Sequence, residues 1–240
     1  MNIALIFAGG SGIRMNNSAY PKQFLHLHNK EIIIYTIEKF ENCSEIDAIV
    51  VVCIEEWIPF LYSLLEKYQL KKIKSIVAGG ETGQQSILSG LESIKKKYSE
   101  NNPIVLIHDG VRPLINGELI INCIKSVKEH GSAITVTPEN ETVVSLDSNR
   151  KIVSITDRSR CYNAKAPQCF YFNDIYSAHQ RAKQDGINNM IDSATLMAHY
   201  GHELYTVACG YENIKITTPT DFYIFRALFE AKNNSQIFGI

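Results

Sequence analysis

The sequence lacks the features that mark membrane-spanning, secreted and nucleic-acid-binding proteins. No apolar run in its 240 residues approaches the roughly 20 that a membrane-spanning helix needs. The segment from Met1 to Phe7 has no basic leader and predicts a first strand, not a signal peptide. The formal net charge is -1. We therefore expect neither nucleic acid nor a membrane surface as a partner, and any anion-binding site must be local.

Motifs for structural metals and disulfides are missing as well. The six cysteines form no CxxC pair, and their spacing fits neither a zinc ribbon nor a small disulfide scaffold. His26 and His28 flank Leu27 without a third ligand nearby in the sequence, so they do not predict a shared metal. Free thiols are typical of a reducing compartment, and the sequence therefore predicts a cytoplasmic protein.

The sequence does have a regular alternation of short apolar runs and helical patterns. This alternation predicts a doubly wound, mostly parallel α/β sheet with helices on both faces. The expected strands cover residues 3–8, 48–53, 73–77, 104–108, 132–137, 203–208 and 214–217. The expected helices cover residues 31–40, 57–68, 83–97, 117–130, 173–184, 193–200 and 221–232.

The alternation changes at Pro138. Two short apolar segments, 142–146 and 151–155, flank a polar turn and predict a hairpin. We expect a single domain over residues 1–240, with this hairpin inserted as a β-arm at about 138–163. A hairpin of two strands is marginally stable in water without a surface to pack on. The arm therefore favours a homodimer.

The first predicted strand ends in a glycine-rich loop, Ala8-Gly9-Gly10-Ser11-Gly12-Ile13-Arg14-Met15, with Lys22 after it. Glycines allow a ligand to approach the backbone closely, and successive N–H groups can then surround phosphate oxygens. Two cations, Arg14 and Lys22, beside such a loop suit a polyphosphate. The loop is not a Walker P-loop, because no Gly-Lys-Ser/Thr follows. It is not the dinucleotide fingerprint either, because Met15 stands at the third glycine position.

Three other stretches carry candidate polar groups. Asp109 and Arg112 follow strand 104–108, at the end of the strand where open α/β sheets bind ligands. Taken alone, they are more simply a local turn pair. Gly79-Gly80-Glu81-Thr82 precedes a helix that Glu81 or Thr82 could cap. Lys215 lies in a late apolar segment before Thr218, which can cap the last helix with Pro219 at its first position.

At this point the chain resembles a known family. The glycine-rich loop followed by Pro21-Lys22-Gln23-Phe24-Leu25 is similar to the signature of sugar-nucleotide pyrophosphorylase-type enzymes. More narrowly, it resembles cytidylyltransferases that act on 2-C-methyl-D-erythritol 4-phosphate or ribitol 5-phosphate, over nearly the whole chain. The resemblance implies a Rossmann-like nucleotidyltransferase fold, CTP as donor and Mg²⁺ as cofactor. It also implies a dimer in which the arms of two subunits interlock.

The resemblance also implies roles for individual residues. The implied catalytic cations, which stabilise charge on the phosphates, are Arg14, Lys22 and Lys215. The implied nucleotide-binding residues are Ala8, Gly9, Gly10, Gly12, Gly80, Glu81 and Ser86. The implied acceptor-binding residues are Asp109, Arg112, Thr142, Arg158 and Thr217, with Asp109 also near the metal. Asp221 lies close to a position that supports the metal in related enzymes.

Three positions depart from the family pattern. Gly83 stands where the family has Arg, Ala166 replaces Thr in Thr-Pro-Gln, and Ile191-Asp192-Ser193 replaces a Thr-Asp-Glu-like stretch. Phe7 before the loop and the segment 36–40 resemble the ribitol enzymes more than the isoprenoid ones. We therefore expect D-ribitol 5-phosphate as acceptor and CDP-ribitol as product, for a wall or capsule polymer. The alternative acceptor is 2-C-methyl-D-erythritol 4-phosphate of isoprenoid precursor synthesis.

The expected reaction needs no general base. The second pKa of a phosphate monoester is about 6, so the acceptor phosphate is largely ionised at neutral pH. Two hypotheses of other classes stay open. One is a dinucleotide-binding oxidoreductase, although Glu31 opens a helical pattern instead of ending a second strand. The other is a nucleotide-binding module that has lost its chemistry, which the three departures make conceivable.

Overall fold

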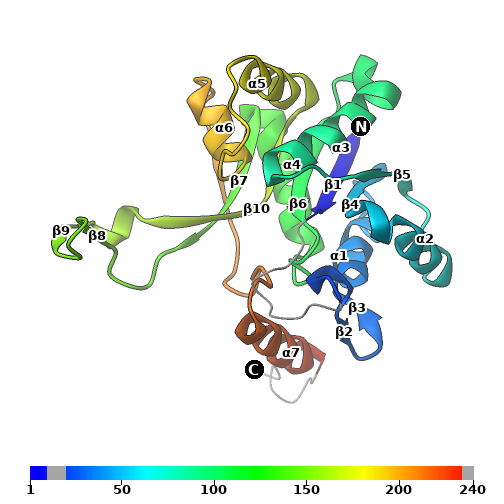
Figure 1. Cartoon of the computed structure of the whole chain (residues 1–240), viewed down its shortest axis with the longest axis horizontal. Helices are drawn as coiled ribbons and strands as arrows, with labels where there is room; N and C mark the ends of the chain where they lie inside the picture. The colour runs from blue at the N-terminus through cyan, green and yellow to red at the C-terminus, as the bar shows by residue number, and fades with distance from the viewer. Residues whose placement is uncertain (10–19, 234–240) are drawn as a thin grey trace.

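The computed structural model describes residues 1–9 and 20–233, which fold around one seven-stranded sheet (Figure 1). The strand order is β11-β7-β10-β6-β1-β4-β5. Its members are β1 (Asn2–Ala8), β4 (Ala48–Cys53), β5 (Ile73–Ala78), β6 (Ile104–Asp109), β7 (Ser132–Pro138), β10 (Tyr162–Tyr171) and β11 (Thr206–Ala208). β1 pairs parallel with β4 and β6, β4 with β5, and β7 with β11. The predicted mostly parallel α/β sheet is confirmed.

β10 is the strand that sequence reasoning missed. It pairs antiparallel with both β6 and β7 and so lies in the middle of the sheet. Lys165, Pro167 and Gln168 interrupt its apolar pattern, which is why the run did not predict a strand. Its register against β7 shifts between Ala164 and Gln168. Such an irregularity accommodates a proline, which has no N–H to donate to a ladder.

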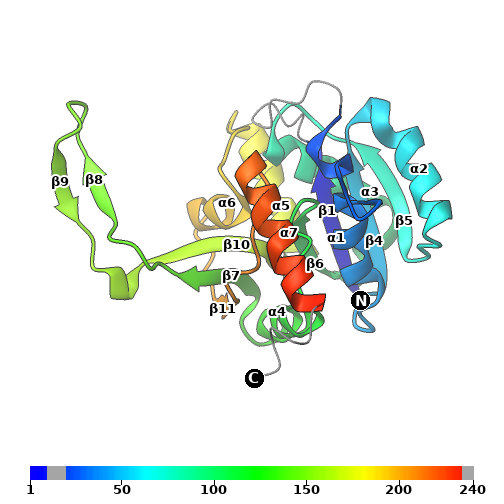
Figure 2. The same cartoon turned by 90° about the horizontal axis from the view of Figure 1, so that it is seen from below.

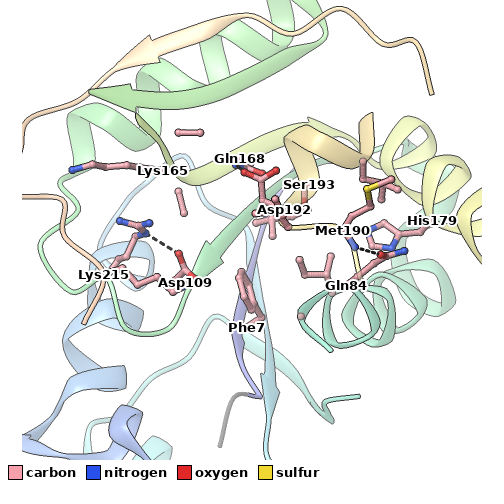
Figure 3. A pocket seen from close by; sticks show the side chains of 18 residues that line it. Phe7, Gln84, Asp109, Lys165, Gln168, His179, Met190, Asp192, Ser193 and Lys215 are labelled. Carbon is pink, nitrogen blue, oxygen red and sulfur yellow. Dashed lines mark hydrogen bonds and ion pairs between the residues drawn. The ribbon is translucent and has the colours of Figure 1, made fainter. Parts of the chain in front are cut away.

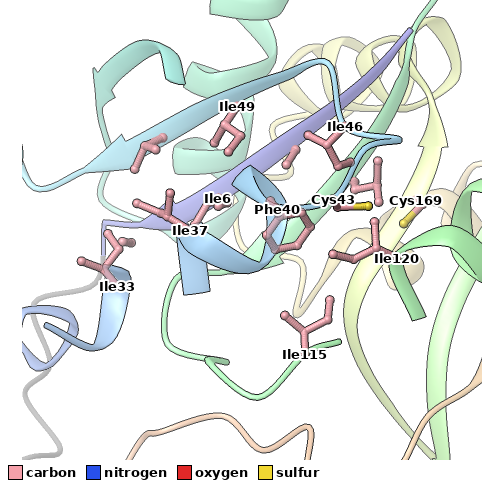
Figure 4. Close-up of a cluster of buried hydrophobic side chains, with 14 of the residues drawn as sticks. Ile6, Ile33, Ile37, Phe40, Cys43, Ile46, Ile49, Ile115, Ile120 and Cys169 are labelled. Atoms are coloured by element: carbon pink, nitrogen blue, oxygen red, sulfur yellow. The ribbon is translucent and has the colours of Figure 1, made fainter. Parts of the chain in front are cut away.

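Helices cover both faces of the sheet. One face packs against α1 (Ile32–Glu41), α2 (Ile58–Lys67) and α4 (Gly117–His130), as Figure 4 shows in part. The other packs against α3 (Gly83–Tyr98), α5 (Phe172–Gln184) and α6 (Ser193–His199). Along β1, Ala4 and Ile6 face the first layer, whereas Ile3 and Leu5 face the second. This alternation of a strand buried on both sides explains its continuous apolar run.

The chain ends with α7 (Pro219–Asn233), which packs outside the sheet on a third cluster that includes Tyr35, Ile216 and Phe225. The predicted strand at 214–217 was wrong. The N–H of Ile216 donates to the carbonyl of Val111 over 2.9 Å, but no ladder forms among the described residues. Ile216 is fully buried, so its apolar spacing reflects packing under α7 and not pairing in a sheet.

The hairpin inserted between β7 and β10 projects away from the domain (Figure 2). It consists of β8 (Val144–Leu146) and β9 (Ile152–Ile155), paired antiparallel. All residues of both strands are exposed. Short elements complete the described chain: β2 (His26–Leu27), β3 (Lys30–Glu31), η2 (Lys22–Phe24), η3 (Glu55–Trp57), η4 (Ser99–Asn101) and η5 (Arg158–Arg160). Among the described helices, none has the length and apolarity to cross a membrane.

Candidate active site

Four neighbouring parallel strands, β5, β4, β1 and β6, end at one edge of the sheet, where the segments that follow them come together. In the register, Phe7 lies beside Asp109, Ala8 beside Cys53, and Cys53 beside Ala78. The glycine turn after β1, the glycine turn after β5 and the carboxylate at the end of β6 therefore share this edge. It is the carboxyl end of the strands, where an open α/β sheet binds its ligand.

Two adjoining cavities open at this edge. The first, which we call the glycine cavity, lies between the two glycine turns. Its lining includes Ala8, Gly9, Lys22, Gly80, Glu81 and Ser86. The second, which we call the β10 cavity, lies between β6, β10 and α6 (Figure 3). Its lining includes Arg112, Lys165, Ala166, Gln168, Asp192 and Ser193. Among the described residues, four border both cavities: Phe7, Gly83, Asp109 and Lys215.

The two glycine turns can lie so close because neither carries a side chain. A Cβ at Gly9 would lie 2.9 Å from Oγ of Ser86, and one at Gly79 would lie 3.0 Å from the same atom. Ser86 Oγ instead accepts from the N–H of Gly80 over 3.1 Å. The hydroxyl of Thr82 accepts from the N–H of Gln85, so Thr82 caps α3 as predicted. The glycines of both turns therefore form part of the wall of the glycine cavity.

Asp109 binds a cation with each of its oxygens. Oδ1 lies 2.6 Å from Nζ of Lys215, and Oδ2 accepts from Nε of Arg112 over 2.7 Å. The turn pair between Asp109 and Arg112 therefore exists, but it is also part of the site. Asp109 and Arg112 are buried, whereas the Lys215 side chain is 38% exposed. The ammonium of Lys215 consequently stands where the two cavities meet.

The electrostatics of this cluster follow from burial and the two cations. Burial alone would raise the pKa of Asp109, but Lys215 and Arg112 outweigh it and lower the pKa to about 2. Burial lowers the pKa of the neighbouring His108 to about 4. At neutral pH the cluster is a carboxylate between two cations beside an uncharged imidazole. It carries a net positive charge facing the cavities.

The segment that carries Lys215 is tied to both neighbouring strands by Asn213. Its carbonyl accepts from Nη1 of Arg112 over 2.9 Å, and its Nδ2 donates to the carbonyl of Ala166 over 2.8 Å. All three of these residues are buried. Asn213 therefore links the end of β6, the middle of β10 and the Lys215 segment.

The structure places some of the expected residues away from these cavities. The hydroxyl of Thr217 donates to Oδ2 of Asp221 over 2.6 Å, and the N–H groups of Thr217 and Thr218 donate to the same oxygen. Thr217 and Asp221 thus bond to each other at the start of α7. Thr142 and Arg158 lie in the arm, where Nη1 of Arg158 donates to the carbonyl of Asn140. Three further expected site residues, Gly10, Gly12 and Arg14, lie outside the described residues.

Sequence reasoning gave no role to several polar residues of the β10 cavity. Gln168 donates to Oδ2 of Asp192 over 2.9 Å and accepts from the N–H of Ala194, which joins β10 to the start of α6. The signal that could have found them was present. The three departures from the family pattern, Gly83, Ala166 and Ile191, all border this one cavity.

The described residues provide few ligands for a metal ion. Both oxygens of Asp109 are engaged by cations, and no group of three or more His, Cys, Asp or Glu side chains could hold a metal within the described ranges. Glu81 is a second carboxylate, bordering the glycine cavity with Asp109. Mg²⁺ is usually bound by one or two carboxylates together with substrate phosphates and water. These carboxylates therefore fit a Mg²⁺ ion only if the nucleotide phosphates and water supply most of its ligands.

The comparison with known proteins decides the family. The model of "IspD: 2-C-methyl-D-erythritol 4-phosphate cytidylyltransferase" matches residues 2–231. The chain belongs to this family. Proteins named ribitol-5-phosphate cytidylyltransferase from Streptococcus agalactiae and Vibrio parahaemolyticus are both 53% identical, over 100% of either chain. A 2-C-methyl-D-erythritol 4-phosphate cytidylyltransferase from Clostridium acetobutylicum is 37% identical, over 98% of this chain and 100% of its own.

Solved structures of the family have the same fold. The 4-diphosphocytidyl-2C-methyl-D-erythritol synthase of Anaerococcus prevotii matches with a TM-score of 0.82 and 27% identity, over 95% of this chain and 96% of its own. The predicted family is confirmed, and this IspD-family chain is a nucleotidyltransferase. The oxidoreductase hypothesis is wrong. Glu31 lies at the start of α1, where its carboxylate meets Nε2 of His26 and accepts from the Tyr68 hydroxyl, and it borders neither cavity.

Proposed function

We propose that this enzyme transfers CMP from CTP to D-ribitol 5-phosphate, giving CDP-ribitol and pyrophosphate. The observation that carries the proposal is the pair of adjoining cavities that share Asp109 and Lys215. Relatives named for ribitol 5-phosphate at 53% identity, against 37% for a relative named for 2-C-methyl-D-erythritol 4-phosphate, support this acceptor. In this proposal the glycine cavity takes the nucleotide and the β10 cavity takes the acceptor.

The nucleophile is an oxygen of the acceptor phosphate. It attacks the α-phosphorus of CTP, the bond from that phosphorus to the bridging oxygen breaks, and pyrophosphate leaves with the bonding electrons. Because the acceptor phosphate is already largely ionised near neutral pH, no side chain needs to remove a proton. The buried His108 and His179 have pKa values lowered by burial to about 4, which suits neither for that task. The protein has to hold two anions together and spread the negative charge.

The cations of the site supply that electrostatic work. Lys215 stands between the two cavities and can contact both the α-phosphate and the incoming phosphate, while Lys22 borders the glycine cavity. Arg14 belongs to the same set by its place in the glycine-rich loop. Asp109 keeps Lys215 and Arg112 side by side through its two ion pairs. Mg²⁺ would be held by the phosphates of CTP and by the carboxylates that border the glycine cavity, Asp109 and Glu81. When bound, it would neutralise phosphate charge.

The enzyme is proposed to work as a homodimer in the cytoplasm. The arm exposes apolar side chains on a two-stranded hairpin, and Ile155 is 67% exposed. A second copy of the chain is the surface that such an arm fits. Thr142 and Arg158 of one arm would then reach the acceptor phosphate in the other protomer. Six free cysteines support a reducing compartment.

Release of pyrophosphate tests the proposal directly. CTP, UTP and ATP would each be assayed with D-ribitol 5-phosphate, D-erythritol 4-phosphate and 2-C-methyl-D-erythritol 4-phosphate, with and without Mg²⁺. The expected result is the highest kcat/KM with CTP and D-ribitol 5-phosphate, with loss of turnover on chelation. A higher kcat/KM with 2-C-methyl-D-erythritol 4-phosphate would replace the acceptor by the alternative. Pyrophosphate release without any acceptor would refute the transfer reaction.

A further inference from the structure

Two polar side chains at one end of the β10 cavity have no hydrogen-bond partner in the described chain. The two ring nitrogens of His179 and the hydroxyl of Ser193 make no hydrogen bond, although the residues are only 2% and 3% exposed. Both border the β10 cavity, His179 from α5 and Ser193 from the first turn of α6. Buried polar groups without a partner are rare because each costs free energy. Two such residues bordering one cavity indicate a polar ligand.

A neighbouring polar side chain at this end of the cavity, Gln84, is engaged by the protein. Gln84 donates to the carbonyl of Ile187 over 2.8 Å and accepts from the N–H of Met190 over 2.8 Å. Both the nitrogen and the oxygen of its amide are therefore bonded within the protein. The remaining surface is apolar and includes Ile87, Met190 and Leu196. Among the described residues of this wall, His179 and Ser193 carry the polar groups without a partner.

The cavity is also polarised in charge. Lys165 and Lys215 lie toward one end, on the far side of Phe7 from His179 in Figure 3. Arg112 also borders the cavity and is joined to Lys215 through Asp109. Burial lowers the pKa of His179 to about 4, so the imidazole is neutral at pH 7 and presents one donor and one acceptor. The cationic end suits a phosphate. The other end suits neutral groups that both donate and accept, with carbon between them.

We propose that His179 and Ser193 bind hydroxyl groups of the acceptor's polyol chain and thereby select a chain that carries hydroxyls far from its phosphate. The assignment rests on the proposed function and specifies its acceptor. A hydroxyl can donate to one atom and accept from another, so it satisfies either tautomer of the imidazole. The carbon atoms of the chain would pack on Met190 and Leu196. The cavity volume of 290 Å³ is at the small end for ligand sites, as a short chain requires.

The ring of His179 also borders a second cavity, between α3 and α5, lined in part by Leu88, Lys183 and Asn188. One ring nitrogen of His179 together with the Ser193 hydroxyl is sufficient for the proposed contact.

The test is His179→Leu and Ser193→Ala, assayed with D-ribitol 5-phosphate and with its 1-deoxy analogue, which lacks the hydroxyl farthest from the phosphate. We expect each substitution to raise the KM for ribitol 5-phosphate about tenfold, the typical worth of one hydrogen bond, and to leave the KM for CTP unchanged. The wild type should prefer ribitol 5-phosphate to the deoxy analogue, and this preference should shrink in both variants. His179→Asn, which keeps a donor and an acceptor, should recover part of it.

Thermal unfolding separates this role from a structural one. Replacing an unsatisfied buried polar group by an apolar one should keep or raise the Tm of the free His179→Leu protein. The matched control is Gln180→Leu, because Nε2 of Gln180 is also buried without a partner but the residue borders neither the β10 cavity nor the second one. Its KM values should equal those of the wild type.

The outcomes distinguish the two proposals. A wild type that uses ribitol 5-phosphate, with variants that keep its KM and its preference over the deoxy analogue, would overturn the role of His179 and Ser193 alone. A wild type that prefers another polyol phosphate would overturn the proposed acceptor, and the same variants would be measured on that substrate. A wild type that turns over no hydroxylated acceptor would refute both.

Discussion

The ammonium of Lys215 lies 2.6 Å from Oδ1 of Asp109, and the two residues come from segments more than a hundred positions apart. This pair stands at the boundary between the glycine cavity and the β10 cavity. The carboxylate anchors the lysine, while the 38% exposure of the lysine side chain leaves it accessible to a ligand. One ion pair therefore fixes a cation at the point where donor and acceptor phosphates would meet.

The first prediction concerns the lysine itself. Lys215→Ala should lower kcat by a factor on the order of 10²–10³, because a cation that stabilises transition-state charge is lost. Its matched control is Lys30→Ala, which breaks a 2.7 Å ion pair with Glu38 outside both cavities and should leave kcat unchanged. Steady-state pyrophosphate release measures both. Near-wild-type kcat in Lys215→Ala, with circular dichroism unchanged, would contradict the mechanism.

Asp109→Asn tests the carboxylate. Removing one partner of a buried ion pair typically costs about 3–5 kcal/mol, because the remaining charge stays buried. Here Arg112 is the buried partner left behind, so the variant should unfold at lower urea concentration. Glu38→Gln removes the carboxylate of the partly exposed Lys30 pair and should cost no more than about 1 kcal/mol. Equal losses in the two variants would argue against the buried cluster.

The pH dependence of stability follows from the same carboxylate. Its folded pKa of about 2 is below the unfolded value of about 3.9, so its stabilisation is fully present above pH ~4. This contribution is lost as the pH falls through the folded pKa. We expect wild-type stability to decline between about pH 4 and 2 more steeply than that of Asp109→Asn, measured by urea unfolding across that range. Parallel curves would show that Asp109 does not couple to folding.

The pH dependence of catalysis should instead follow the ionisation of the acceptor phosphate. Its second pKa is about 6, so kcat/KM for the acceptor should fall below that pH as the nucleophile becomes protonated. A phosphonate analogue of the acceptor, whose second pKa is higher, should move the falling limb to higher pH. If the falling limb of the pH profile stays at the same pH with the phosphonate, the titrating group belongs to the enzyme. A general base would then have to be considered.

Asn213→Asp tests how the site is positioned. The aspartate is nearly isosteric, but it cannot donate to the carbonyl of Ala166, and its charge would face that oxygen. We expect the KM for the acceptor to rise about ten- to a hundredfold, as for a lost buried hydrogen bond with an unsatisfied partner, while the KM for CTP changes little. Asn122→Asp, on the exposed side of α4, is the control. A rise in both KM values together would indicate general loss of structure instead.

The arm makes a prediction about assembly. Ile155→Asp should convert a dimer into a monomer, because it places a charge within the apolar surface of the hairpin. Ser148→Asp in the turn between β8 and β9 should leave the dimer intact. Sedimentation velocity reports the mass of each, and acceptor KM should rise in the monomer if Thr142 and Arg158 act across the interface. A monomeric wild type would exclude this assembly.

The sequence by itself determined the layered sheet, because repeated short apolar runs separated by helical patterns are typical of strands buried on both faces. The glycine-rich loop, Asp109 and Lys215 were all chosen from local patterns and the family resemblance. Asp109 and Lys215 border the cavities, whereas most of the loop lies outside the described residues. The predicted strand at 214–217 was wrong because an alternating apolar pattern shows only which side chains are buried. It does not show whether a strand or a helix covers them. Here α7 covers Ile216.

Only the tertiary structure decided how these parts combine. β10 enters the middle of the sheet antiparallel, carrying Lys165, Ala166 and Gln168 to the cavity, and no local pattern encodes that placement. The unsatisfied groups of His179 and Ser193 are also invisible in sequence, since satisfaction depends on neighbours distant along the chain. Local spacing fixes which face a side chain takes on its own strand or helix. Which distant side chains meet it, and whether its hydrogen bonds are filled, is a property of the packed fold.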